Sequence, residues 1–175
     1  AQVPNARILA ISPDRAWVAY VVFNDPYREI WAVPWSGGNA KQALNEKDLP
    51  KADLGAGYGE RQLVAESLRW IPGTHSLAIR TVAIPATADM QPRQDLWNLN
   101  VDTGDLTPIV GLDPASSFQF SPDGRQVAVL RRGGSGLPAG SLAIYNADGS
   151  NERRALDFPA NVAGVSYETQ LGWQP

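Results

Sequence analysis

Short apolar segments alternate with turn-forming residues along this chain, and each apolar segment is too short for a helix. Residues 18–23, 77–84 and 127–130 are rich in β-branched and small apolar side chains and are bounded by Pro, Gly, Asp and Asn. This pattern is typical of strands joined by tight turns. The sequence therefore predicts an all-β chain, whose many short strands suit a sandwich, a barrel or a propeller.

An internal repeat favours the propeller. When the four prolines Pro13, Pro72, Pro122 and Pro175 are placed in register, large apolar residues stand two and four positions before each of them. These residues are Leu9 and Ile11, Leu68 and Trp70, Phe118 and Phe120, and Leu171 and Trp173. An apolar strand also follows each of the first three prolines, so each unit begins with a strand, a tight turn and a strand. The repeat length of roughly 50–60 residues suits propeller blades that carry loop insertions.

A second register in each unit adds two more strands. It aligns Ile30 with Leu96 and Leu142, Val33 with Leu99 and Tyr145, Ser36 with Asp102 and Asp148, and Leu44 with Val110 and Leu156. The third of these sets falls in turns, where Gly supplies the positive φ of a tight hairpin. Each unit is therefore expected to hold four antiparallel strands.

The turn sequences carry a family resemblance. Residues 120–128 read Phe-Ser-Pro-Asp-Gly-Arg-Gln-Val-Ala, and residues 11–14 read Ile-Ser-Pro-Asp. They resemble the Ser-Pro-Asp-Gly blade signature of TolB-like, WD-repeat-like β-propellers, although the copies at Pro72 and Pro175 lack the Ser and Asp. The resemblance implies a β-propeller, a fold that serves as a docking platform, a ligand binder or a gating domain of peptidases.

The expected organisation is one partial β-propeller over residues 1–175. Blade 1 covers about 7–45, a loop insertion covers 45–62, blade 2 covers about 64–111 and blade 3 about 115–158, and residues 165–175 form the first strand of a fourth blade. About three blades do not close a ring. The sequence therefore predicts self-association, or remaining blades supplied by a longer parent protein.

Loop lengths predict which end of the blades binds. The turns between first and second strands and between third and fourth strands are uniformly tight, whereas the other connections vary widely in length. Variable loops on a rigid scaffold are where binding usually resides. The residues expected to contact a ligand there are Tyr27, Lys51, Asp53, Tyr58, Arg61, Arg93 and Asp95.

Catalytic patterns are missing from this sequence. It has one histidine, His75, no cysteine and no G-x-S-x-G elbow, so no catalytic residue, metal site or cofactor is expected. Glu66 and Glu168 are candidates for a carboxylate pair, but their offsets from the repeat prolines place them on opposite strand faces.

Composition and charge further limit the classes of partner that this chain is expected to bind. The chain is 43% hydrophobic and 19% charged with a net charge of −3, which gives no electrostatic footprint for nucleic acid. No apolar run approaches the roughly 20 residues of a membrane-spanning helix, and the Ala1-Gln2 start suits a processed, exported protein.

The expected function is a non-catalytic bacterial scaffold outside the cytoplasm that binds a protein or an extracellular or envelope ligand. The alternative is the N-terminal gating propeller of a prolyl-oligopeptidase-like serine peptidase, whose catalytic domain would lie outside this sequence.

Overall fold

The chain folds into three four-stranded antiparallel sheets, as expected from the repeat. The structure is a computed structural model, and it describes residues 6–50, 57–87, 89–90, 92–112, 117–132 and 140–158. The first sheet contains β1 (Ala6–Ile11), β2 (Trp17–Asn24), β3 (Tyr27–Pro34) and β4 (Lys41–Asn45). The second contains β5 (Tyr58–Trp70), β6 (Ser76–Pro85), β7 (Arg93–Asn100) and β8 (Leu106–Leu112). The third contains β9 (Ser117–Phe120), β10 (Gln126–Arg132), β11 (Gly140–Asn146) and β12 (Arg153–Phe158).

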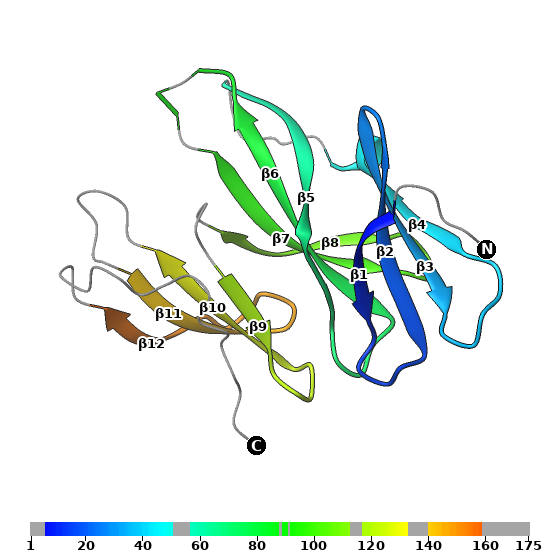
Figure 1. The fold of residues 1–175 in the computed structure, drawn as a ribbon. Helices are drawn as coiled ribbons and strands as arrows, with labels where there is room; N and C mark the ends of the chain where they lie inside the picture. The colour runs from blue at the N-terminus through cyan, green and yellow to red at the C-terminus, as the bar shows by residue number, and fades with distance from the viewer. Residues whose placement is uncertain are drawn as a thin grey trace.

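Each sheet is a meander in which neighbouring strands follow one another in the chain. The three sheets are called blades 1, 2 and 3 below. Figure 1 shows them side by side, with blade 2 between the other two. A short 3-10 helix, η1 (Glu46–Asp48), follows the last strand of blade 1.

In blades 1 and 3 a serine and an aspartate hold the tight turn between the first two strands. In blade 3 the Ser121 hydroxyl donates to Asp123 Oδ1 (2.6 Å) and accepts from the Gln126 amide (3.0 Å), while the Arg125 amide donates to the same Asp123 oxygen (3.1 Å). The bond from Ser121 lowers the pKa of the Asp123 carboxyl below its ordinary value. Asp123 is therefore a structural residue of the turn.

Blade 1 repeats this arrangement. Ser12 Oγ donates to Asp14 Oδ1 (2.5 Å) and accepts from the Trp17 amide (2.9 Å), and the pKa of Asp14 is lowered for the same reason. Ser12 and Ser121 are themselves buried, so these bonds satisfy hydroxyl groups that water does not reach.

Apolar residues fill the two junctions between the blades. Alternate residues on the strands point to opposite faces of a sheet, so each blade presents two apolar faces. The first junction joins Val21 and Ile30 of blade 1 to Trp70 and Leu77 of blade 2. The second joins apolar residues of blade 2, such as Ile71 and Leu96, to others of blade 3, such as Phe120, Val127 and Tyr145.

Side-chain hydrogen bonds also cross the first junction. The indole Nε1 of Trp70 donates to the backbone oxygen of Ala10 (2.8 Å), and the Lys41 ammonium donates to the backbone oxygen of Asp102. These bonds add directional contacts to the apolar packing of blade 1 on blade 2.

The expected loop insertion at 45–62 is partly regular structure. Residues 46–48 form η1, and β5 begins at Tyr58, so its first five residues lie inside the segment expected as loop. The strand extends this far because residues 58, 61 and 62 pair with the end of β6 across a register shift. The expected start of a fourth blade, 165–175, lies outside the described residues. No helix in the described part is long and apolar enough to cross a membrane.

Candidate binding site between blades 1 and 2

A hollow of about 650 Å³ opens between blades 1 and 2 at the end that carries the variable connections. The turn between β2 and β3 forms one side, η1 and the residues after it form another, and the start of β5 completes it. The lining residues are Pro26, Tyr27, Arg28, Glu46, Lys47, Leu49, Pro50, Tyr58, Gly59, Glu60, Arg61 and Gln62. The hollow is therefore built from both blades and depends on how they dock.

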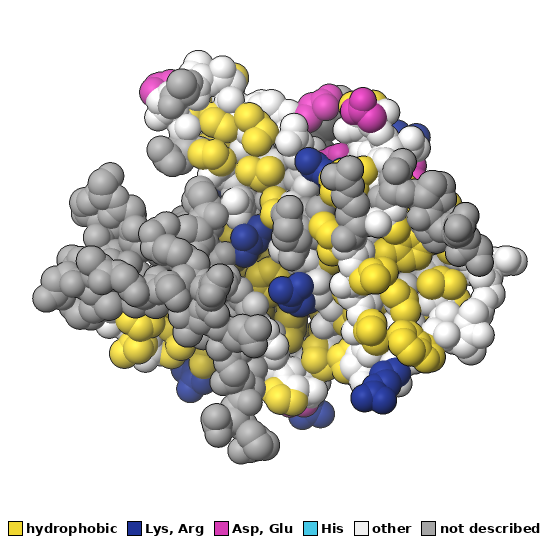
Figure 2. Space-filling model, viewed as in Figure 1, with side chains coloured by type: hydrophobic (Ala, Val, Ile, Leu, Met, Phe, Trp, Pro, Cys, Tyr) yellow, Lys and Arg dark blue, Asp and Glu magenta, His cyan; other side chains and the backbone are white. Residues whose placement is uncertain are grey.

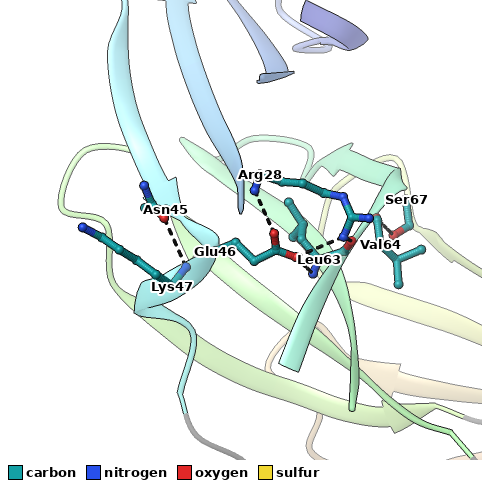
Figure 3. Close-up of polar contacts among 7 residues, drawn as sticks. All are labelled: Arg28, Asn45, Glu46, Lys47, Leu63, Val64 and Ser67. Atoms are coloured by element: carbon teal, nitrogen blue, oxygen red, sulfur yellow. Dashed lines mark hydrogen bonds and ion pairs between the residues drawn. The ribbon is translucent and has the colours of Figure 1, made fainter. Parts of the chain in front are cut away.

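A buried carboxylate in the lining of this hollow joins the two blades, and Figure 3 shows its polar contacts. Glu46 is only 6% exposed, and its Oε2 accepts from the Arg28 amide (2.7 Å). Its Oε1 accepts from Arg28 Nη1 (3.0 Å) and from the Leu63 amide (2.6 Å). Arg28 Nη1 also donates to the Leu63 oxygen (2.9 Å), so β3, η1 and β5 meet at one charged group.

Local sequence places Glu46 at this point. The Asn45 side chain accepts from the Lys47 amide (3.1 Å), and the Leu49 amide donates to the Glu46 oxygen (3.2 Å), which together close η1. The turn directs the Glu46 side chain toward β5 and leaves Lys47 exposed. Because the carboxylate has three hydrogen bonds and a cationic partner, its burial is compensated.

Arg61 and Asp95 form a second buried ion pair beside the hollow. Their side chains are 8% and 15% exposed, and Arg61 Nη1 contacts Asp95 Oδ2 directly. The Arg61 guanidinium lies 5.1 Å from the centre of the Trp97 ring, and Trp97 Nε1 donates to Thr81 Oγ1 (3.0 Å). The pair thus fixes the wall of the hollow, and among the described residues Arg61 Nε has no hydrogen-bond partner.

Four of the seven residues expected to bind lie in or next to the hollow. Tyr27, Tyr58 and Arg61 line it, and Asp95 is joined to Arg61. Arg93 is exposed at the start of β7 and is not among the lining residues. The remaining two, Lys51 and Asp53, lie outside the described residues.

Sequence reasoning missed Arg28 and Glu46, although the repeat contains a signal for the glutamate. In the second register Glu46 stands two positions after Leu44, where blades 2 and 3 have Leu112 and Phe158. A single carboxylate at a repeat position that is otherwise apolar indicates a blade-specific contact. The hydrogen bonds of Glu46 to Arg28 and Leu63 are that contact.

His75 lies in a tight turn, at the other end of the blades. It is exposed, its Nδ1 lies 3.2 Å from Asp102 Oδ2, and its ring packs edge-on against Trp17. Within the described ranges no group of three or more His, Cys, Asp or Glu is arranged to hold a metal ion.

Comparison with known proteins identifies the fold. The sequence matches no protein-family profile and no curated protein sequence. Its structure is similar to that of uncomplexed acylaminoacyl peptidase from Pyrococcus horikoshii, with 14% identity and a TM-score of 0.64 over 90% of this chain and 26% of that chain. It is also similar to the β-propeller domain of the Trilobed protease from Pyrococcus furiosus, with 18% identity and a TM-score of 0.59 over 88% of this chain and 44% of that chain.

A putative TolB from Agrobacterium tumefaciens is similar as well, with 18% identity and a TM-score of 0.51 over 90% of this chain and 51% of that chain. The chain thus spans about a quarter of the peptidase and about half of the other two. These likenesses, together with the three four-stranded meanders, establish that the chain has a β-propeller fold, of which the described residues form three blades.

Proposed function

We propose that this chain is a non-catalytic propeller scaffold that binds a polypeptide segment in the hollow between blades 1 and 2. The observation that carries the proposal is the hollow itself, about 650 Å³ at the variable-loop end. Its walls contain two ion pairs, one between the half-buried Arg28 and the buried Glu46 and one between Arg61 and Asp95. A preformed concave site on a rigid scaffold is the usual setting of a binding site.

The charges of the hollow favour a polypeptide over a polyanion. Glu46 and Arg61 are already compensated by Arg28 and Asp95. The exposed charged residues left on the lining are Lys47 and Glu60, one of each sign. Tyr27 is exposed beside them and offers an apolar ring with a polar tip, as contact residues in protein interfaces commonly do.

Photo-crosslinking tests this proposal even when the partner has not been identified. A benzophenone amino acid is placed at Tyr27, at Lys47 or, as the control, at Thr103, which is exposed in a tight turn at the opposite end of the blades. We expect the first two variants to crosslink the same partner in cells and the Thr103 variant not to. The purified partner should then bind with a Kd at least about tenfold weaker after Tyr27→Ala, a loss of about 1.4 kcal/mol.

Identical adducts from all three positions, or no adducts from Tyr27 and Lys47, would overturn the proposal that the hollow between blades 1 and 2 is the binding site. Hydrolysis of peptides or glycosides by the purified chain would overturn the non-catalytic role. An extracellular or envelope location in a bacterium belongs to the same proposal, and it is tested by fractionating cells that express the natural gene.

A gating propeller of a serine peptidase is the second candidate, and the likeness to the two proteases favours it. Here the loop end would control access to a catalytic domain elsewhere in the parent protein. The natural reading frame decides between the two: a downstream G-x-S-x-G followed by Asp and His supports the peptidase, and further blades alone support the scaffold.

A further inference from the structure

The outward face of blade 1 is apolar and exposed. The register of β1 with β2 and of β2 with β3 places Leu9, Ile11, Val18, Trp31 and Val33 on the face that points away from blade 2. Leu9 is 69% exposed and Ile11 is 53% exposed. Figure 2 shows hydrophobic side chains gathered over β1 to β3 in this part of the molecule.

The same repeat positions are buried in blade 2. Leu68 and Trp70 stand at the positions of Leu9 and Ile11, and both are buried because blade 1 packs against them. Leu77 and Leu99 stand at the positions of Val18 and Val33 and are fully buried. The outward face of blade 1 therefore has the composition of a junction face that receives a preceding blade.

The outward face of blade 3 has the complementary composition. In blade 1, the residues that pack against blade 2 are Val21, Ile30, Ala32 and Leu44. Their equivalents in blade 3 are Leu130, Leu142, Ile144 and Leu156, which the register places on the face away from blade 2. Leu156 is 52% exposed, so this face also presents apolar area.

A hydrogen bond across the first junction involves two positions that have equivalents on these outward faces. Lys41 of β4 donates to the backbone of Asp102 in the blade 2 turn. The repeat equivalents of these two residues are Arg153 of β12 and Ser36 of the blade 1 turn, and both are exposed. A blade 3 docked on a blade 1 would bring the two together.

A close backbone approach at the second junction has a counterpart as well. A Cβ at Gly149 of blade 3 would fall on the carbonyl oxygen of Ile109 in β8, so the two backbones touch. The repeat equivalent of Gly149 is Gly37, which has nothing within 4 Å, and that of Ile109 is Ala155, which is exposed. The free turn of blade 1 thus has the same residue as the blade 3 turn that approaches blade 2 closely, whereas the blade 2 turn has Thr103 at this position.

We propose that the outward face of blade 1 binds the outward face of blade 3 of a second copy of this chain. Two copies joined in this way form two identical head-to-tail junctions and close into a two-fold ring. Four strands about 4.8 Å apart and about six residues long cover roughly 400 Å² per face. Two junctions with two faces each bury roughly 1,600 Å², the size of a stable interface. Two copies also have about the length of the TolB chain that one copy half covers.

Crosslinking between single-cysteine variants tests the head-to-tail geometry, because the natural chain has no cysteine. Ser36→Cys and Arg153→Cys are prepared separately and treated with a short bis-maleimide, alone and mixed. We expect a covalent dimer in the mixture and at most a trace in either variant alone. A face-to-face dimer of two blade 1 surfaces would instead crosslink Ser36→Cys with itself, which would overturn the proposal.

Solution mass gives the second measurement. We expect light scattering to report twice the 18.9 kDa of the chain. Leu9→Lys on one face and Leu156→Lys on the other should each weaken the dimer at least tenfold, with unchanged circular dichroism because both side chains are exposed. Ile84→Lys, at an exposed apolar residue at the end of β6, is the control and should leave the mass unchanged. A monomer at 100 μM, or open polymers of increasing mass, would overturn the proposed ring.

Discussion

Glu46 shows how one side chain makes two neighbouring blades into one site. Its carboxylate accepts from Arg28 in β3 and from Leu63 in β5, so it links the sheets where the hollow opens. The apolar side chains of the junction are closely packed beside it, but they make no directional bonds of this kind. The geometry of the hollow thus depends on this charge as well as on the core beside it.

Replacement of Glu46 by leucine, the residue of blade 2 at this repeat position, should destabilise the fold. The Leu63 amide would lose its acceptor and Arg28 would lose its counter-ion, so we expect a loss of about 3 kcal/mol in the free energy of unfolding. Urea denaturation measures it. Glu60→Gln, which changes an exposed glutamate of the same lining, should cost less than about 0.5 kcal/mol. Equal stability of Glu46→Leu and the natural chain would show that the buried charge does not hold the junction.

The two Ser-Asp turns make a pH prediction. The pKa of Asp123 is lowered mainly by its bond from Ser121, so its contribution to stability is present above the ordinary carboxyl pKa and is lost as the pH falls through the lowered pKa. Ser121→Ala should raise the pKa of Asp123 toward the ordinary value of 3.8. The variant should therefore lose less stability than the natural chain as the pH falls through this range. Carboxyl NMR titration reports the shift, and the pKa of Asp14 in the blade 1 turn should remain unchanged. A Ser121→Ala chain with the same Asp123 pKa would assign the lowering to the backbone bond of Arg125.

At the scale of elements, the repeat predicts strands and turns well because each follows from local chemistry. Prolines and glycines mark the turns, and the apolar positions before and after them mark the strand faces. The sequence predicts Tyr27, Tyr58 and Arg61 near one another because loop length alone indicates the variable end of the blades. It places residues 58–62 in a loop insertion because they lie before the residues that the repeat aligns, whereas in the structure they pair with the end of β6 across a register shift.

The contacts of Glu46 and of the Arg61–Asp95 pair depend on the docking of sheets and on strand register, and neither is encoded within one repeat. Asp95, which the sequence predicts as a ligand contact, pairs with Arg61 from two strands away in the same sheet, and the sequence does not predict this pairing. Of these residues, only Glu46 indicates such a contact from the sequence, because it is a polar residue at a repeat position that is apolar in the other two blades.

A pair of glycines in equivalent turns separates backbone strain from blade docking. Gly73 and Gly124 have φ values of +72° and +69°, but nothing lies within 4 Å of a Cβ at Gly73, whereas a Cβ at Gly124 would meet the Pro72 carbonyl of blade 2. Both alanine variants carry the cost of positive φ, roughly 1 kcal/mol. We expect Gly124→Ala to cost roughly 1–3 kcal/mol more, because it overpacks the junction of blades 2 and 3. Equal losses in thermal or urea unfolding would show that the turn of blade 3 does not press on blade 2.

At the scale of the whole molecule, the three blades bury two junctions and leave two apolar outward faces. The residues of these faces match those of the buried junctions at the same repeat positions, as Leu9 and Leu68 show. A monomer exposes Leu9, Ile11 and Leu156 to water, and each buried methylene group contributes about 0.8 kcal/mol. Folding and association are therefore expected to be coupled in this chain.

Such coupling predicts a melting temperature that depends on protein concentration. When only the folded chain associates, mass action stabilises the folded state by an amount that grows with concentration, so the Tm should rise by several degrees between about 1 and 100 μM. In Ile11→Lys, the Tm at high concentration should fall to the value that the natural chain has at low concentration, and the dependence should disappear. The control variant Ile84→Lys should keep the dependence of the Tm on protein concentration. A concentration-independent Tm in the natural chain would mean that its outward faces remain exposed and that stability comes from the two internal junctions alone.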